Sequence, residues 1–250
     1  MKSIHVAIIG LALATPSLCL AAGGISGSVH DFSTNSWNTA TSGTNSPGRR
    51  ATCGACHSAH NTDPLQTAPL WNHANSALAA FTPYTSPTMN AVAGRPAGIS
   101  LACLSCHDGT VAVNAKIGGT TFTGGSAVFI DPSAVISQDL HVTHPISFTY
   151  DSALATADGA LEDPATYKIG DAKTRLTVQT APVPASWSGT ILTGKTLTEA
   201  LLPGGRMECS SCHDVHKQEG SAPTSGILAR ISGSDTDGRG SLLCRTCHVK

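Results

Sequence analysis

The sequence predicts a single domain of mostly irregular loops with short α-helices and few short strands, wrapped around bound groups that replace a side-chain core. Three observations predict this class. Charged residues make up 12% and aromatic residues 4% of the 250 positions, whereas an ordinary soluble domain has roughly 25% charged residues. Glycine and proline, 25 and 14 residues, interrupt the chain about every ten residues. Eight of the nine cysteines fall into four closely spaced pairs, so the interior is expected to be filled by something other than large apolar side chains.

Residues 1–22 are predicted to be a secretory signal, which leaves residues 23–250 as the single domain. Lys2 supplies the positive start, residues 6–14 (VAIIGLALA) supply the apolar stretch, and small residues lie around position 22. The alternative, an N-terminal membrane anchor, is disfavoured because the apolar run is short and is broken by Pro16. Cys19 falls inside the signal, and the residues before it do not fit a lipoprotein site. We therefore expect an exported protein with no membrane span in the mature chain.

The eight cysteines that follow the signal all belong to C-x-x-C-H motifs, numbered 1 to 4 in chain order. They are CGACH (Cys53, Cys56, His57), CLSCH (Cys103, Cys106, His107), CSSCH (Cys209, Cys212, His213) and CRTCH (Cys244, Cys247, His248). This is the attachment pattern of a c-type haem: the two thiols form thioethers with the vinyl groups, and the adjacent histidine reaches the iron from the proximal face. The sequence thus predicts four covalently bound c-type haems and a multihaem cytochrome c fold.

Disulfides, zinc ribbons and thioredoxin-like redox pairs are the competing interpretations of paired cysteines. None of them requires a histidine directly after every second cysteine, as all four motifs have. Export favours haem as well, since the attachment chemistry takes place outside the cytoplasm. A net charge of -1 without a basic stripe gives no basis for nucleic-acid binding.

The second axial ligand of each iron is predicted to be histidine. Only Met89 and Met207 follow the signal, so methionine cannot close four irons. The histidines outside the motifs and the signal are His30, His60, His73, His141, His144 and His216. We take all of them as candidate distal ligands except His141, which is the weakest. Five candidate histidines then remain for four irons, so one of these histidines can have a structural role instead.

His60 and His216 each follow a motif histidine by three residues. Three residues span at most about 10 Å, which is too little to pass round a porphyrin and reach the far face of the same iron. If either histidine is a ligand, it therefore binds the iron of a different haem. Both segments would then hold two haems each, which predicts close side-by-side haems.

Few regular elements are expected between the motifs. Residues 146–150 (ISFTY) alternate as a short strand does, and residues 197–202 (LTEALL) indicate a short helix. Residues 118–126 (GGTTFTGGS) read as a loop, and further short helices are expected at the attachment sites.

The motifs and their surroundings resemble the tetrahaem nanowire cytochromes, such as outer-membrane cytochrome E. The resemblance rests on the order of HDFS, CGACHSAHN, PLWNH, CLSCHDG, THPISFTY, CSSCHDVH and a final CRTCH, from about His30 to His248. It implies bis-histidine haems in one continuous stack and subunits that polymerise into extracellular filaments. It also implies a distal histidine supplied by the neighbouring subunit, with His60 closing the iron held by Cys244, Cys247 and His248.

The function expected from the sequence is electron transfer without enzymatic activity, in the extracellular space or at the cell surface. Self-association into filaments, redox partner proteins and extracellular or periplasmic electron acceptors are the expected partners. A soluble periplasmic tetrahaem shuttle is the main alternative. A multihaem reductase is a weaker one, because it needs an iron with an open position and the histidines suffice to close all four.

Overall fold

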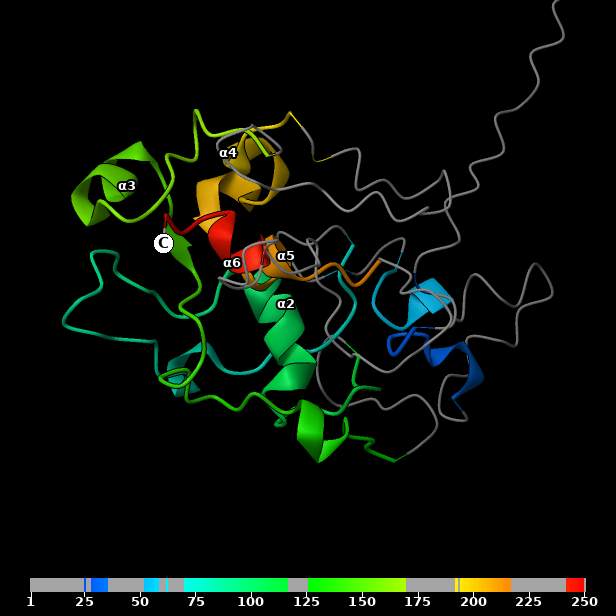
Figure 1. The fold of residues 1–250 in the computed structure, drawn as a ribbon. Helices are drawn as coiled ribbons and strands as arrows, with labels where there is room; N and C mark the ends of the chain where they lie inside the picture. The colour runs from blue at the N-terminus through cyan, green and yellow to red at the C-terminus, as the bar shows by residue number, and fades with distance from the viewer. Residues whose placement is uncertain are drawn as a thin grey trace, which may run out of the picture.

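The computed structural model describes residues 25, 28–35, 52–58, 62, 70–116, 126–169, 192, 194–216 and 242–249. Regular elements in these ranges are short (Figure 1). The α-helices are α2 (Gly98–His107), α3 (Ser152–Asp158), α4 (Leu197–Ala200), α5 (Cys209–Cys212) and α6 (Leu242–Arg245); the 3-10 helices are η1 (Phe32–Thr34), η3 (Leu78–Ala80), η4 (Pro132–Ala134) and η6 (Pro203–Gly205); the strands are β1 (Phe148–Thr149) and β2 (Arg206–Met207). The predicted signal, His60 and most of residues 118–126 lie outside the described residues.

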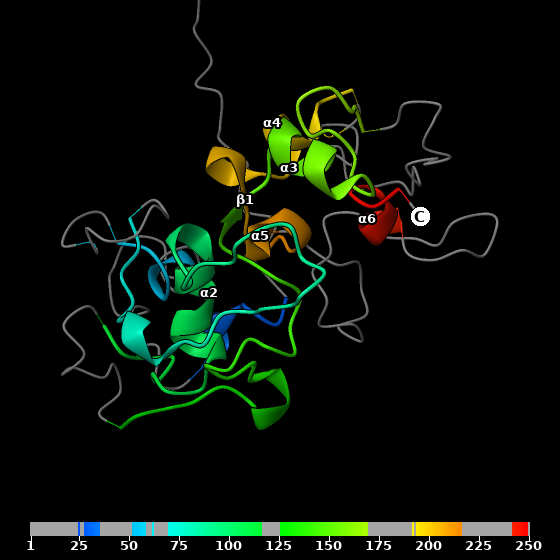
Figure 2. The same ribbon diagram turned by 90° about the vertical axis from the view of Figure 1, so that its left-hand side faces the viewer.

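Helix α2 occupies the middle of the molecule and carries motif 2 at its C-terminal end. It ends where Asp108 caps it and Gly109 takes a φ of 78°, a left-handed conformation that favours glycine. A Cβ at Gly109 would also lie 2.9 Å from the Val135 side chain, so glycine lets the 128–136 loop approach closely. Helix α2 packs against α5, which carries motif 3, and both views of the ribbon show the two helices side by side (Figure 2).

The two strands form one small antiparallel sheet, in which Phe148 pairs with Met207 and Thr149 pairs with Arg206. Strand β1 lies within the segment whose alternation predicts a strand. Helix α4 covers the first four residues of the predicted 197–202 helix, and a capping box between Thr196 and Glu199 starts it. The sheet leads directly into α5, so it fixes where motif 3 begins.

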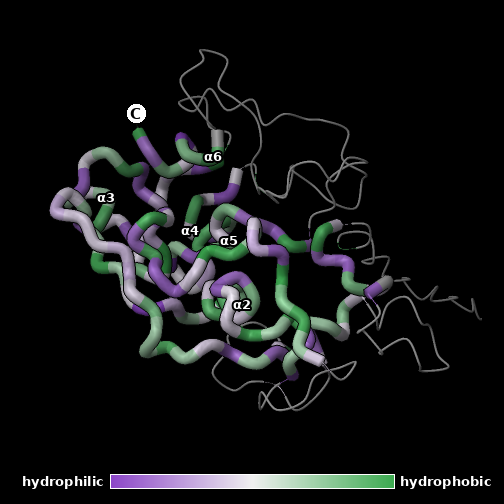
Figure 3. Tube along the Cα trace, turned by 90° about the horizontal axis from the view of Figure 1, so that it is seen from below, coloured by the Kyte–Doolittle hydropathy of each residue, from purple (hydrophilic) through white to green (hydrophobic). Residues whose placement is uncertain are grey.

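Side-chain packing in the described residues is divided among small clusters. The largest contains Phe148, Tyr150, Ala155, Tyr167, Ile169, Leu197, Leu201, Leu202 and Met207. A second contains Phe81, Leu101, Leu104 and Leu140, and a third contains only alanines, Ala74, Ala112 and Ala115. Hydrophobic and hydrophilic stretches alternate over short distances along the trace (Figure 3), whereas a domain of this length usually has one contiguous core.

No helix among the described residues has both the length and the apolar character needed to cross a membrane. The C-terminal segment instead returns to the largest cluster. The Val249 N–H donates to the Ala160 carbonyl over 2.9 Å, and the Glu162 N–H donates to the Cys247 carbonyl over 2.8 Å. These bonds hold motif 4 beside residues 160–162.

Candidate haem-binding sites

Each motif is built on a single helical turn. In motifs 1, 3 and 4 the N–H of the motif histidine donates to the carbonyl of the first cysteine, over 2.9 Å at His57 and 3.0 Å at His213 and His248. Motif 2 is the last turn of α2. Residues three and four positions apart lie on the same face of a helical turn. Each turn therefore presents two thiols and one imidazole to the same side, as attachment to one porphyrin edge requires.

All eight motif cysteines are free thiols, and none forms a disulfide. Burial raises the pKa of Cys56 to about 11, and it raises the pKa of Cys106 and of Cys247 to about 12. These thiols are therefore protonated at neutral pH, and they lack the thiolate character of a redox or metal-binding cysteine.

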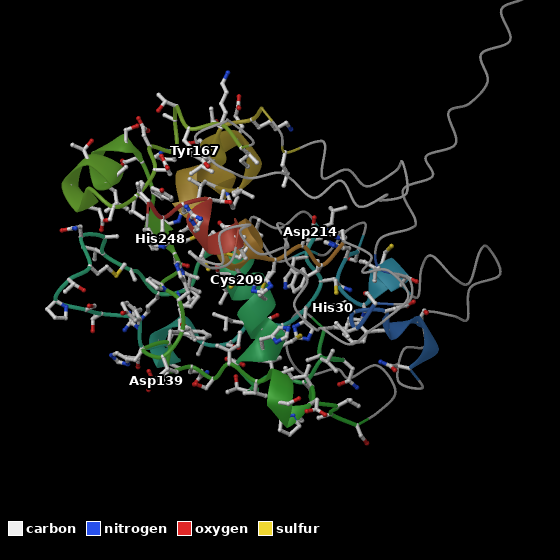
Figure 4. All side chains as sticks on the ribbon, in the orientation of Figure 1. His30, Asp139, Tyr167, Cys209, Asp214 and His248 are labelled. Carbon is white, nitrogen blue, oxygen red and sulfur yellow. The ribbon has the colours of Figure 1, made fainter. Side chains whose placement is uncertain are left out.

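Thiols of different motifs lie close to one another. The Cys103 and Cys209 thiols interact strongly enough that their contact raises the pKa of Cys103 and lowers that of Cys209. Packing of α2 on α5 produces this contact between motifs 2 and 3. Figure 4 shows Cys209 in the middle of the molecule, with His248 to one side and His30 to the other. Cys56 also acts on the pKa of Cys106, and Cys212 acts on that of Cys247, so motif 1 lies near motif 2 and motif 3 lies near motif 4.

Three motif histidines face a histidine from outside the motifs. The ring centroids of His57 and His216 are 6.3 Å apart, with 18° between the ring planes. The corresponding values are 6.0 Å and 50° for His30 and His107, and 6.4 Å and 74° for His144 and His248. Each pair joins distant parts of the chain, and His216 lies opposite the histidine of another motif, as the limit on its reach requires.

Backbone hydrogen bonds orient two of these rings. The His107 Nδ1 lies 2.9 Å from the Ala134 carbonyl oxygen, and the His144 Nδ1 lies 2.8 Å from that of Pro145. Histidines that bind metals usually donate one ring N–H to such a carbonyl, which fixes the tautomer and leaves Nε2 as the ligand. Burial lowers the pKa of His30 to about 4, so its ring is neutral at physiological pH, the form that binds metal.

The other candidate histidines are placed differently. His73 is buried, with Nδ1 2.8 Å from the Ala74 carbonyl and Nε2 2.9 Å from the Ala112 carbonyl, so both ring nitrogens contact the backbone. His141 is exposed and pairs with Asp139 at 2.6 Å. The motif histidine His213 is exposed, and partial burial of its ring together with the nearby His107 lowers its pKa.

Two further residues lie at these sites, one marked weakly by the sequence and the other not at all. The Trp71 ring contacts the His57 ring edge-on, with centroids 6.0 Å apart, and its place two residues before the candidate ligand His73 is the only sequence sign of such packing. Glu208 directly precedes Cys209 and is 97% buried, since only 3% of its side chain is exposed. No sequence signal marks Glu208, because the two hydroxyls that donate to its carboxylate, those of Ser100 and Ser147, lie 108 and 61 residues away in the chain.

No protein-family model matches this chain, and a search of curated proteins finds no match either. The assignment of function therefore depends on the motifs and on the geometry described above.

Proposed function

We propose that this protein is an electron-transfer protein that carries four covalent c-type haems with histidine on both faces of each iron. The observation that carries the proposal is the pairing of three motif histidines with three histidines from outside the motifs. Haem would supply one-electron redox chemistry, and the chain would supply the thioether attachments, the axial ligands and the spacing between sites.

The separations of the paired rings fit one metal between them. With a metal–nitrogen bond of about 2 Å and a ring centroid about 1.1 Å beyond each nitrogen, two imidazoles on opposite sides of an iron have centroids about 6 Å apart. The three pairs lie at 6.0, 6.3 and 6.4 Å. On this basis His216 would serve the haem of motif 1, His30 that of motif 2, and His144 that of motif 4.

Elimination leaves His60 for the haem of motif 3. Both nitrogens of His73 contact backbone carbonyls, and His141 is paired with Asp139. The resemblance to nanowire cytochromes instead implies His60 as the partner of His248, but His144 already lies opposite His248 in the same chain. We therefore propose that His60 closes the iron beside His213, from the same chain or from a neighbouring subunit.

Irons closed by two histidines have no position for a substrate, which favours electron transfer over a reductase. Contact between thiols of motifs 2 and 3 supports short distances between haems. Export and assembly into extracellular filaments complete the proposal, and these two parts rest on the predicted signal and on the resemblance.

Two measurements test the proposal. The protein is produced in a bacterium with a c-type maturation system, and the intact mass is compared with that of the chain. We expect the mass of four haems and an optical spectrum of low-spin iron that does not change on adding nitrite. Fewer haems, or a high-spin population that binds nitrite, would contradict it. Electron microscopy of the secreted fraction then separates filaments from the discrete particles that a periplasmic shuttle would give.

A further inference from the structure

Glu208 is a buried carboxylate surrounded by donors. Its Oε2 accepts hydrogen bonds from the Ser100 hydroxyl and, over 3.2 Å, from the Ser147 hydroxyl. Its Oε1 accepts from Nε of Arg206 over 3.2 Å. The backbone of Glu208 starts α5: its carbonyl accepts the Ser211 N–H over 2.8 Å, and its N–H donates to the Ser211 hydroxyl over 2.9 Å. The side-chain partners Ser100, Ser147 and Arg206 all donate hydrogen bonds to the carboxylate.

The carboxylate lies between two haem attachment sites. Glu208 immediately precedes Cys209 of motif 3. Its partner Ser100 lies one turn before Cys103 on α2, and the Ser100 hydroxyl also accepts the Cys209 N–H over 2.9 Å. The negative charge of Glu208 contributes to the pKa of both the Cys103 and the Cys209 thiols. One buried charge therefore acts on two motifs.

The cation beside Glu208 does not cancel this charge fully. The Arg206 side chain is 38% exposed, whereas that of Glu208 is 3% exposed. Water screens an exposed charge strongly and a buried charge weakly. The net field at the neighbouring thiols is therefore that of an anion.

We propose that Glu208 is a positioning residue that lowers the reduction potentials of the haems held by Cys103 and Cys209; this inference rests on the proposed function. An iron closed by two neutral histidines in a porphyrin carries one net positive charge when ferric and none when ferrous. Reduction adds one electron and removes that charge. A nearby anion stabilises the ferric form, so it makes each added electron harder to accept.

The test is a mediated redox titration of the purified four-haem protein, followed optically at neutral pH. The Glu208→Gln variant keeps the shape of the side chain and one acceptor but removes the charge. We expect a positive shift of the midpoint potential in one or two of the four components, with the others unchanged. Glu208→Asp, which keeps the charge, should shift the same components less. Unchanged potentials in Glu208→Gln would overturn the proposal.

Arg206→Gln supplies a second variant with the opposite sign. Removing the positive charge of Arg206 leaves more of the negative charge of Glu208 unbalanced. The midpoint potentials of the same components should therefore become more negative. A purely structural role predicts shifts of the same sign in both variants, because loosening the packing admits water in either case. Shifts of the same sign would therefore overturn the proposal. If Glu208→Gln does not fold, a shift to more positive potential in Arg206→Gln alone would overturn it, and so would an unchanged potential.

Glu199→Gln is the matched control. Glu199 also belongs to a capping box, accepting the Thr196 N–H over 2.9 Å, but it lies exposed on α4. It should change no potential. Failure of the proposed function would give a protein without four haem components to titrate. Failure of this inference alone would give four components that Glu208→Gln leaves in place.

Discussion

Replacing His216 with methionine tests the pairing of the histidine rings through the electronic structure of the iron. In a ferric haem with two imidazoles, the plane of each ring sets the direction of its π interaction with the iron d orbitals. Parallel planes reinforce one another and split two of these orbitals, whereas perpendicular planes leave them nearly degenerate. The combined splitting follows the cosine of the interplanar angle.

Under the proposed function, the interplanar angles of the three pairs would give different splittings. The cosine is about 0.95 for His57 and His216 at 18°, about 0.64 for His30 and His107 at 50°, and about 0.28 for His144 and His248 at 74°. We therefore expect the first haem to give a rhombic low-spin signal in electron paramagnetic resonance. The last should give a broad signal with one very large g value, and the haem between them should be intermediate.

The assay is electron paramagnetic resonance of the fully oxidised protein at liquid-helium temperature. His216→Met should remove the rhombic signal and keep the broad one, and His144→Met should do the reverse. The matched control is His141→Ala, which removes an exposed histidine paired with Asp139 and should change neither signal. Loss of the broad signal in His216→Met, or a single type of signal from all the irons, would refute the pairing.

Three further predictions follow from the packing and from the motifs. Tyr150→Phe should destabilise the protein by about 1–2 kcal/mol, because the buried Tyr150 hydroxyl donates to the Glu162 carbonyl over 2.7 Å and lies near the Cys247 carbonyl. Guanidinium unfolding measures this loss of stability. The control is Tyr84→Phe, since the Tyr84 hydroxyl makes no hydrogen bond within the described ranges. Leu197→Ala should lower the free energy of unfolding by about 2–5 kcal/mol in the same assay, since Leu197 is 0% exposed in the largest cluster. An unchanged midpoint would show that haem rather than this cluster determines stability. The double variant Cys53→Ala with Cys56→Ala should lose the mass of one haem and retain three; a loss of all haem would mean that the sites do not load independently.

Local features could be predicted from the sequence. The spacing of two cysteines and a histidine already defines the one-turn geometry of every motif, because hydrogen bonding within a turn needs no distant partner. The reach of three residues likewise predicts that His216, if it is a ligand, does not serve the haem of its own motif, and its ring lies beside that of His57. Helix α4 and strand β1 follow patterns that are complete within six residues.

The partners of each site could not be predicted in the same way. Pairing of His30 with His107 depends on how η1 and α2 pack, and nothing in either segment encodes the other. His73 has a promising context, yet both its nitrogens contact backbone carbonyls, one of them from a loop almost forty residues away. Glu208 precedes a motif without any pattern, and its role arises only when α2 brings Ser100 to it.

The histidine pairs also have a consequence for how the chain matures. Each motif is complete in a single turn, so under the proposed function haem would be attached to a chain that has not yet folded. The opposing histidines lie about 80, 100 and 160 residues from their motif partners, so each ligation would close a loop of that length. A covalent cross-link over a loop of about 100 residues stabilises a fold by roughly 4–5 kcal/mol. If every motif cysteine binds haem, the iron–histidine bonds would constrain the fold in the way that disulfides constrain many exported proteins.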